Sequence, residues 1–150
     1  MSTKSNITSE QLSRLEKSLF QLSGVIQQHQ EIVQKRFNVS AVEVEILHLL
    51  NSAGDQKMKD IGETVKVKLS NLTNIVDRLE SQKLVKRINS KTDRRSIFVH
   101  ISAKGKKLLA NYGDFLRELS TRMSQEVKND QFKTLVDGLE KISQISFPQS

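Results

Sequence analysis

The side chains best suited to chemistry form a short polar group near the middle of the chain. Ser70, Asn71, Thr73 and Asn74 have the spacing that places them on one outer face of a helix, and Lys68 stands just before them. The asparagine amide can donate one hydrogen bond and accept another, which matches the edge of adenine. The threonine hydroxyl can form a hydrogen bond with a base or a phosphate, and the threonine methyl can pack on the methyl group of thymine. Ser70, Lys68 and the positive end of the helix suit phosphate. Taken alone, this pattern favours an ordinary solvated helix face; combined with the charged hairpin tip described next, it favours a helix that reads the major groove of DNA.

A second group is a run of charge between two segments that favour strands. Asp93, Arg94 and Arg95 lie at the tip of the predicted hairpin, and arginine is favoured by the negative potential of a narrow, A·T-rich minor groove. We expect Asp93 to pair with a neighbouring arginine and hold the tip in one shape. The alternative is a flexible charged loop. Four further basic residues are predicted to lie near phosphates: Arg78, Lys86, Arg87 and Lys91.

The distribution of charge points to a polyanionic partner. The 150 residues carry 24 Lys and Arg against 17 Asp and Glu, a net charge of +7. Residues 57–107 alone hold 14 of the basic and five of the acidic residues, so this segment carries +9 and the remainder −2. A basic segment of this size suits nucleic acid, a membrane surface or an acidic protein.

Other chemistries find little support in the sequence. The chain has no cysteine, which excludes disulfides, thiolate ligands and a cysteine nucleophile. Its three histidines lack metal-ligand spacing, and it has neither a Gly-x-Ser-x-Gly motif nor a Gly-rich phosphate loop. We therefore expect no enzyme activity, no cofactor and no metal. Without a long apolar stretch or a signal-peptide core, the chain is predicted to be cytoplasmic.

Hydrophobic spacing predicts a mainly helical chain with one small hairpin. Thr8 with Gln11 and Ser40 with Glu43 have the spacing of capping boxes, and Asn129-Asp130 is expected to cap the last helix. The helices are expected over 8–36, 40–53, 59–65, 69–83, 103–127 and 130–146, and the strands over 84–89 and 97–101. The helix over 69–83 should turn its apolar residues inward: Leu69, Leu72, Ile75, Val76 and Leu79.

The first helix carries a long apolar stripe that requires a partner helix, from the same chain or from a second copy. Its polar interruption is His29, expected at an interface, with an effector pocket or a pH-sensitive joint as alternatives. The stripe follows steps of three and four residues: Leu12, Leu15, Leu19, Leu22, Ile26 and, after His29, Val33.

The stretch 61–109 resembles the MarR family of transcription regulators. Residues 72–80 (LTNIVDRLE) look like the recognition helix of that family, and residues 84–87 (LVKR) look like the strand that leaves it. Residues 93–95 (DRR) match the wing-tip motif, and residues 99–105 (VHISAKG) resemble the return strand and the start of the next helix.

The resemblance implies a mainly α fold with a small β-hairpin wing, in a single domain over 1–150. Residues 40–102 would form a winged helix-turn-helix lobe that binds double-stranded DNA, and 8–36 and 103–147 the dimerisation helices of an obligate homodimer. Arg95 would enter the minor groove, with Arg94 bracing it or touching phosphate. The function implied is a repressor of a pseudo-palindromic operator that a small aromatic or anionic effector releases.

Three positions depart from the family pattern. Lys68 stands where a small hydroxyl or acidic N-cap is usual, and Asn74 where arginine is common, and both changes would alter the operator sequence that is read. Lys83 replaces the usual glycine before the first wing strand, so lysine must adopt a conformation that it tolerates less well.

Two other functions stay open. A low-specificity architectural or global DNA-binding regulator without an effector would differ in its ratio of specific to non-specific affinity. A basic helical adaptor for an acidic protein or membrane surface would need an amphipathic basic helix edged by bulky aromatics. Here the basic residues gather around a hairpin, and the chain has no tryptophan.

Overall fold

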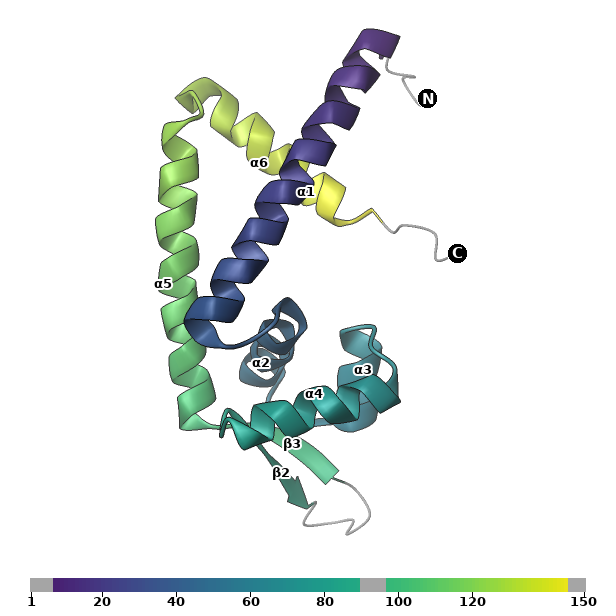
Figure 1. Ribbon diagram of the computed structural model, residues 1–150, viewed down its shortest axis with the longest axis vertical. Coiled ribbons are helices and arrows are strands. Elements are labelled where there is room, and N and C mark those ends of the chain that lie inside the picture. The colour runs from purple at the N-terminus through teal and green to yellow at the C-terminus, as the bar shows by residue number, and fades with distance from the viewer. Residues whose placement is uncertain (1–6, 90–96, 146–150) are drawn as a thin grey trace. The chain divides into compact units, whose positions relative to one another are not determined.

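The computed structural model describes residues 7–89 and 97–145, and the order of its elements follows the sequence prediction with one added strand (Figure 1). The helices are α1 (Ser9–Phe37), α2 (Ala41–Ala53), α3 (Met58–Thr64), α4 (Leu69–Ser81), α5 (Ala103–Gln125) and α6 (Asn129–Ser143). The strands are β1 (Gln56–Lys57), β2 (Val85–Asn89) and β3 (Ile97–Ile101). The chain divides into two compact units, Met1–Leu109 and Ala110–Ser150, so α5 begins in the first unit and continues in the second.

Both predicted capping boxes are confirmed. The Gln11 N–H donates to Thr8 Oγ1 at 3.2 Å, and the Thr8 N–H donates to Gln11 Oε1 at 2.8 Å. At the start of α2, the Glu43 N–H donates to Ser40 Oγ at 3.3 Å, and the Ser40 N–H donates to Glu43 Oε2 at 2.6 Å. These reciprocal bonds satisfy backbone donors that a helix start otherwise leaves open, and they fix where each helix begins.

The predicted hairpin is part of a three-stranded antiparallel sheet of order β1-β3-β2. Val99 at the centre of β3 faces Gln56 of β1 on one side and Arg87 of β2 on the other. The sequence prediction missed β1, because two residues carry no recognisable period and its pairing partner lies about 40 positions away. Asp55, just before β1, also contacts β3, since its Oδ1 lies 2.6 Å from His100 Nδ1.

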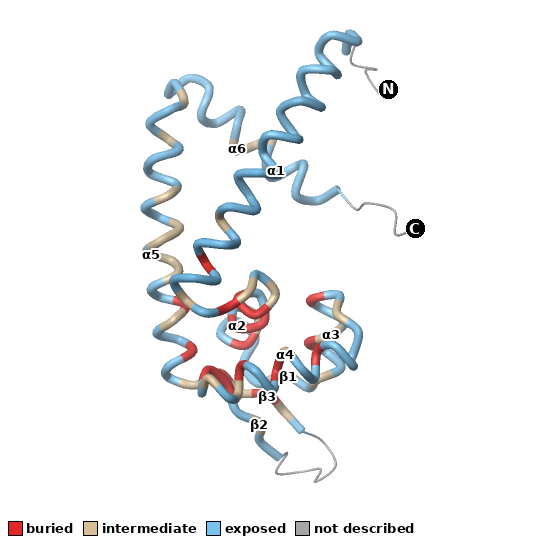
Figure 2. The backbone as a smooth tube through the Cα atoms, in the orientation of Figure 1, coloured by how far each residue is buried: buried red, intermediate tan, exposed pale blue. Residues whose placement is uncertain are grey.

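The core of the first unit lies among α2, α3, α4 and the sheet (Figure 2). Its fully buried apolar side chains are Val39, Ile46, Leu47, Leu50, Ile61, Leu72, Val76, Leu79, Leu84 and Val99. Helix α1 contributes one buried residue, Val33, and leaves the predicted apolar stripe from Leu12 to Ile26 exposed. The apolar face of α4 therefore packs on the core, whereas most of α1 does not contact it.

Several predicted helix ends are corrected. Helix α4 ends at Ser81 rather than 83, because Lys83 adopts a left-handed conformation with φ of 61°, as its substitution for the usual glycine implies. Helix α5 ends at Gln125 and α6 at Ser143, short of the predicted 127 and 146. The cap predicted at Asn129-Asp130 is wrong, since the capping position of α6 is Lys128, which makes no side-chain hydrogen bond there.

The second unit comprises the rest of α5 and α6. None of the residues between 110 and 145 is buried within the chain. Four apolar side chains of α6 are between 41 and 51% exposed: Phe132, Leu135, Leu139 and Ile142. Among the helices that the structure describes, none has the length and apolar character needed to span a membrane.

Among the glycines of the chain, Gly105 has the least room for a side chain. A Cβ atom at this position would lie 2.4 Å from the Leu84 carbonyl oxygen and 2.8 Å from Ile101 Cγ1. The neighbouring Ser102 N–H donates to that same carbonyl at 2.9 Å. The start of α5 is thus packed directly on the start of β2, and a side chain larger than hydrogen would force them apart.

We predict that Gly105→Ala lowers the free energy of unfolding by about 1–3 kcal/mol, because the added methyl overpacks a contact with backbone atoms. Gly24→Ala is the matched control. No atom lies within 4 Å of a Cβ at Gly24, on the exposed face of α1, so alanine should stabilise that helix by up to ~1 kcal/mol. Urea unfolding followed by circular dichroism measures both. Equal midpoints for Gly105→Ala and the wild type would contradict the close packing.

Candidate nucleic-acid interface

Helix α4 presents one apolar and one polar face. Leu72, Val76 and Leu79 are buried beneath it, whereas the predicted groove-reading residues Ser70, Asn71, Thr73 and Asn74 are all exposed. The structure therefore brings these four side chains together on one surface near the N-terminus of α4. Among them, the Thr73 hydroxyl bonds within its own helix, donating to the Leu69 carbonyl at 3.0 Å.

The N-terminus of α4 carries no side-chain cap. The residue at the capping position, Lys68, is exposed and has an extended backbone, and no side-chain hydrogen bond is made there. The first turn of a helix leaves N–H groups that act as an anion site when no side chain occupies them. Lys68 beside such an end adds a mobile positive charge, so this tip suits a phosphate oxygen.

Arg78 anchors α4 to the junction between α1 and α2. Its Nε lies 3.4 Å from Oε1 of Glu43, and its Nη2 donates to the Asn38 carbonyl at 3.2 Å. With its amide oxygen turned toward Arg78, Gln34 accepts a third contact at 3.0 Å. The Glu43 side chain is 2% exposed, and a carboxylate in that setting requires a compensating charge. Arg78 supplies that charge and so holds α4 against the start of α2.

Arg87 anchors the wing strand β2 to α4. Its guanidinium lies 2.6 Å from Asp77 Oδ1 and 2.5 Å from Glu80 Oε2, and its backbone N–H donates to Glu80 Oε1 at 2.9 Å. Asp77 and Glu80 are three residues apart, which places both carboxylates on one side of α4. One arginine thus bridges two carboxylates of α4.

The charges at this bridge stabilise one another. The backbone N–H of Arg87 holds the pKa of Glu80 below its ordinary value, partial burial opposes this, and the guanidinium lowers the pKa further. Burial alone would lower the pKa of Arg87, but its hydrogen bonds to Asp77 and Glu80 outweigh that effect and raise it. These shifts favour the charged forms of Glu80 and Arg87, so the two groups stabilise each other as an ion pair near neutral pH.

Of the other residues predicted to contact DNA, the structure describes only one. Lys86 is exposed on β2, next to Arg87. The predicted phosphate neighbour Lys91 and the wing-tip residues Asp93, Arg94 and Arg95 lie outside the described residues. Sequence reasoning did not assign the anchoring roles of Glu43, Asp77 and Glu80. The three-residue spacing of Asp77 and Glu80 could have indicated that both carboxylates share one side of the helix. For Glu43, the capping box was the only feature of the sequence that pointed to a structural role, and nothing in the sequence indicated that its side chain is buried.

The chain resembles known proteins in both sequence and fold. A sequence model of the MarR family matches residues 39–97, which covers α2 to the start of β3. The HTH-type transcriptional regulator YfiV of Bacillus subtilis is 40% identical over 73 residues, an alignment that spans 49% of the chain and about half (46%) of YfiV. The structure of the transcriptional regulator BldR from Sulfolobus solfataricus is 31% identical, with a TM-score of 0.66 over 91% of this chain and 96% of BldR.

The chain belongs to the MarR family. Its winged helix-turn-helix is the lobe built from α2, α3, α4 and the three-stranded sheet, and the family is one of transcriptional regulators rather than enzymes. A similar fold is that of a mutant of S. aureus MepR bound to an oligodeoxyribonucleotide, with 17% identity and a TM-score of 0.65 over 85% of this chain and 94% of that one.

The pH dependence of stability tests the Arg87 bridge. Because folding lowers the pKa of Glu80, the bridge stabilises the protein fully above the unfolded-state pKa of glutamate and loses this contribution as pH falls through the lower, folded-state value. We predict that Glu80→Gln is less stable than the wild type at pH 7 and that the difference shrinks as the pH falls toward 3.

The control is Glu63→Gln, since Glu63 makes an exposed ion pair with Lys59 at 3.8 Å and such pairs contribute little. Thermal unfolding at fixed ionic strength between pH 7 and 3 measures all three proteins. A Glu80→Gln difference that does not depend on pH would show that the carboxylate charge is not what stabilises this contact.

Proposed function

We propose that the protein is a sequence-specific regulator that binds double-stranded DNA through α4 and the wing. The observation that carries this proposal is the exposed polar group on α4, at an uncapped helix N-terminus. The major groove accepts an α-helix and presents a different pattern of donors and acceptors for each base pair. Asn71 and Asn74 match adenine edges in this proposal, Thr73 a base edge or phosphate, and Ser70 and Lys68 phosphate.

The basic residues take two different roles in this proposal. Lys86 and Lys91 contact phosphate, and Arg95 enters the minor groove with Arg94 beside it, braced by Asp93. Arg78 and Arg87 instead act as positioning residues, because their guanidinium groups already contact Glu43, Asp77 and Glu80. Arg87 is held by two carboxylates and so has little positive charge left to offer a phosphate, and the Arg78 guanidinium is engaged by Glu43 and the Asn38 carbonyl.

The proposed active form is a homodimer that binds a pseudo-palindromic operator. Support comes from the exposed apolar stripe of α1, whose leucines and isoleucine at 12, 15, 19, 22 and 26 are 41 to 50% exposed at coiled-coil spacing. The exposed apolar residues of α6 support it independently. Two recognition helices related by a two-fold axis would read half-sites about one helical turn apart. By its resemblance to the family, we also propose that the protein represses transcription and that a small aromatic or anionic effector relieves this repression.

Binding of base-contact and wing variants to an operator tests the proposed function. The operator is first mapped by footprinting on genomic fragments, and affinity is then measured by fluorescence anisotropy over a range of salt. We predict that Asn74→Ala loses about 1–3 kcal/mol on the operator and little on random duplex. Arg95→Ala should weaken binding and reduce the salt slope by about 0.9.

The control is Arg117→Ala, because Arg117 pairs with Asp114 on the exposed surface of α5. That variant should bind like the wild type. If Asn74→Ala and Arg95→Ala also match the wild type, the assigned contacts are wrong. If the wild type binds the operator and random duplex equally, the protein is an architectural DNA-binding protein, and binding to neither duplex would favour an adaptor.

A further inference from the structure

Leu69 is an exposed apolar residue on the otherwise polar surface at the N-terminus of α4. Its spacing from Leu72, Val76 and Leu79 predicts an inward side chain, but that prediction is wrong. Leu69 is 58% exposed, whereas the other three are fully buried. It is the first residue of α4 and directly precedes Ser70. An exposed leucine thus lies within the group of side chains proposed to read DNA.

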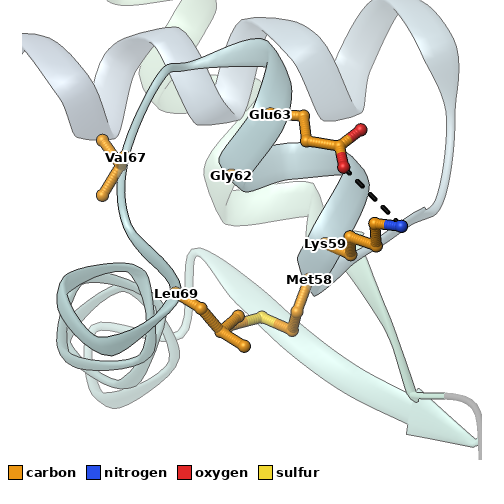
Figure 3. Close-up of a pocket in the computed structure, with 6 residues that line it drawn as sticks. All are labelled: Met58, Lys59, Gly62, Glu63, Val67 and Leu69. Carbon is orange, nitrogen blue, oxygen red and sulfur yellow. Dashed lines mark ion pairs between the residues drawn. The ribbon is translucent and has the colours of Figure 1, made fainter.

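A shallow apolar cavity of about 220 Å³ lies between α3 and the start of α4. Figure 3 shows the Met58 side chain extending from the start of α3 toward Leu69, with Val67 in the connecting turn and the Lys59–Glu63 ion pair at the rim. Most of the exposed lining is apolar.

The place of this cavity in the lobe favours DNA as its occupant. In a helix-turn-helix, the first helix crosses the DNA backbone while the second enters the major groove by its N-terminus. Here those helices are α3 and α4, so the cavity lies where the edge of the groove would pass. Lys59 lines the cavity, and Lys66 and Lys68 are the chain neighbours of the lining residue Val67. All three lysines are exposed, which complements a polyanion. The apolar group that base pairs present in the major groove is the C5-methyl of thymine.

We propose that Leu69, with Met58 behind it, receives the C5-methyl group of one thymine in each half-site and is a specificity determinant of the operator. This inference rests on the proposed function and adds a contact that reads thymine by its methyl group. Asparagine side chains on the same helix would read base edges by hydrogen bonds, so the two kinds of contact are separable.

Removal of single methyl groups from the operator tests this proposal. Each thymine of a half-site is replaced in turn by deoxyuridine, which lacks only the C5-methyl, and affinity is measured for the wild type and Leu69→Ala. Burying one methyl group at the interface increases the affinity about four-fold. The wild type should therefore lose about four-fold at one thymine, and Leu69→Ala should bind the two operators equally.

Two control variants keep the outcomes distinct. Asn71→Ala should bind more weakly overall and keep the penalty at that thymine. Thr73→Ser removes the one other side-chain methyl on the polar face of α4 and should also keep it. The proposal is overturned if Leu69→Ala retains the wild-type penalty, if the penalty disappears in Thr73→Ser instead, or if no thymine shows one.

None of these three results contradicts the proposed function, which the weaker operator binding of Asn74→Ala tests separately. If the wild type shows no preference for the operator over random duplex, both the proposed function and this inference fail. Leu69 is exposed, so Leu69→Ala should fold like the wild type, and its unfolding midpoint checks this directly.

Discussion

The contact of Arg87 with Asp77 and Glu80 holds the strand β2 against helix α4. One guanidinium group bridges two carboxylates that lie one turn apart on α4. On the other side of the helix, Arg78 contacts the buried carboxylate of Glu43, which also caps α2. Helix α4 is therefore held from two directions by charge, in addition to its buried apolar face. Its exposed polar tip is positioned by groups that need not touch DNA.

Because of these contacts, part of the positive charge in the middle of the chain is already paired within the protein. Residues 57–107 carry +9, but not every basic side chain in that segment is free to meet a polyanion. Arg78 and Arg87 contact carboxylates, and Lys104 donates to the Gln82 carbonyl at the end of α4. Lys68, at the capping position of α4, and Lys86, on β2, remain exposed. Part of the charge thus builds the lobe, and part remains for binding.

Local signals in the sequence predicted most of the fold. The capping boxes at Thr8 and Ser40 and the helical spacing of apolar residues placed every described helix within a few residues of its observed ends. The strand β1 was not predicted, because its pairing partner lies far away in the sequence. The exposure of Leu69 and the role of Arg87 were not predicted either, because each depends on how α4 packs against its neighbouring elements. A period of three or four residues shows that Leu69 could face inward. It does not show whether the core extends to the first turn of α4.

The most direct test of this account is the coupling between Arg87 and its two carboxylates in operator binding. The effect of Arg87→Gln on affinity is measured in the wild type and in Asp77→Asn/Glu80→Gln, with Lys86→Gln as the control. If Arg87 positions the wing through these carboxylates, its substitution weakens binding in the wild type and has little effect in the double variant, a coupling of about 0.5–3 kcal/mol. Lys86→Gln should weaken both backgrounds equally. An equal loss for Arg87→Gln in both would show that Arg87 contacts phosphate and would contradict the account.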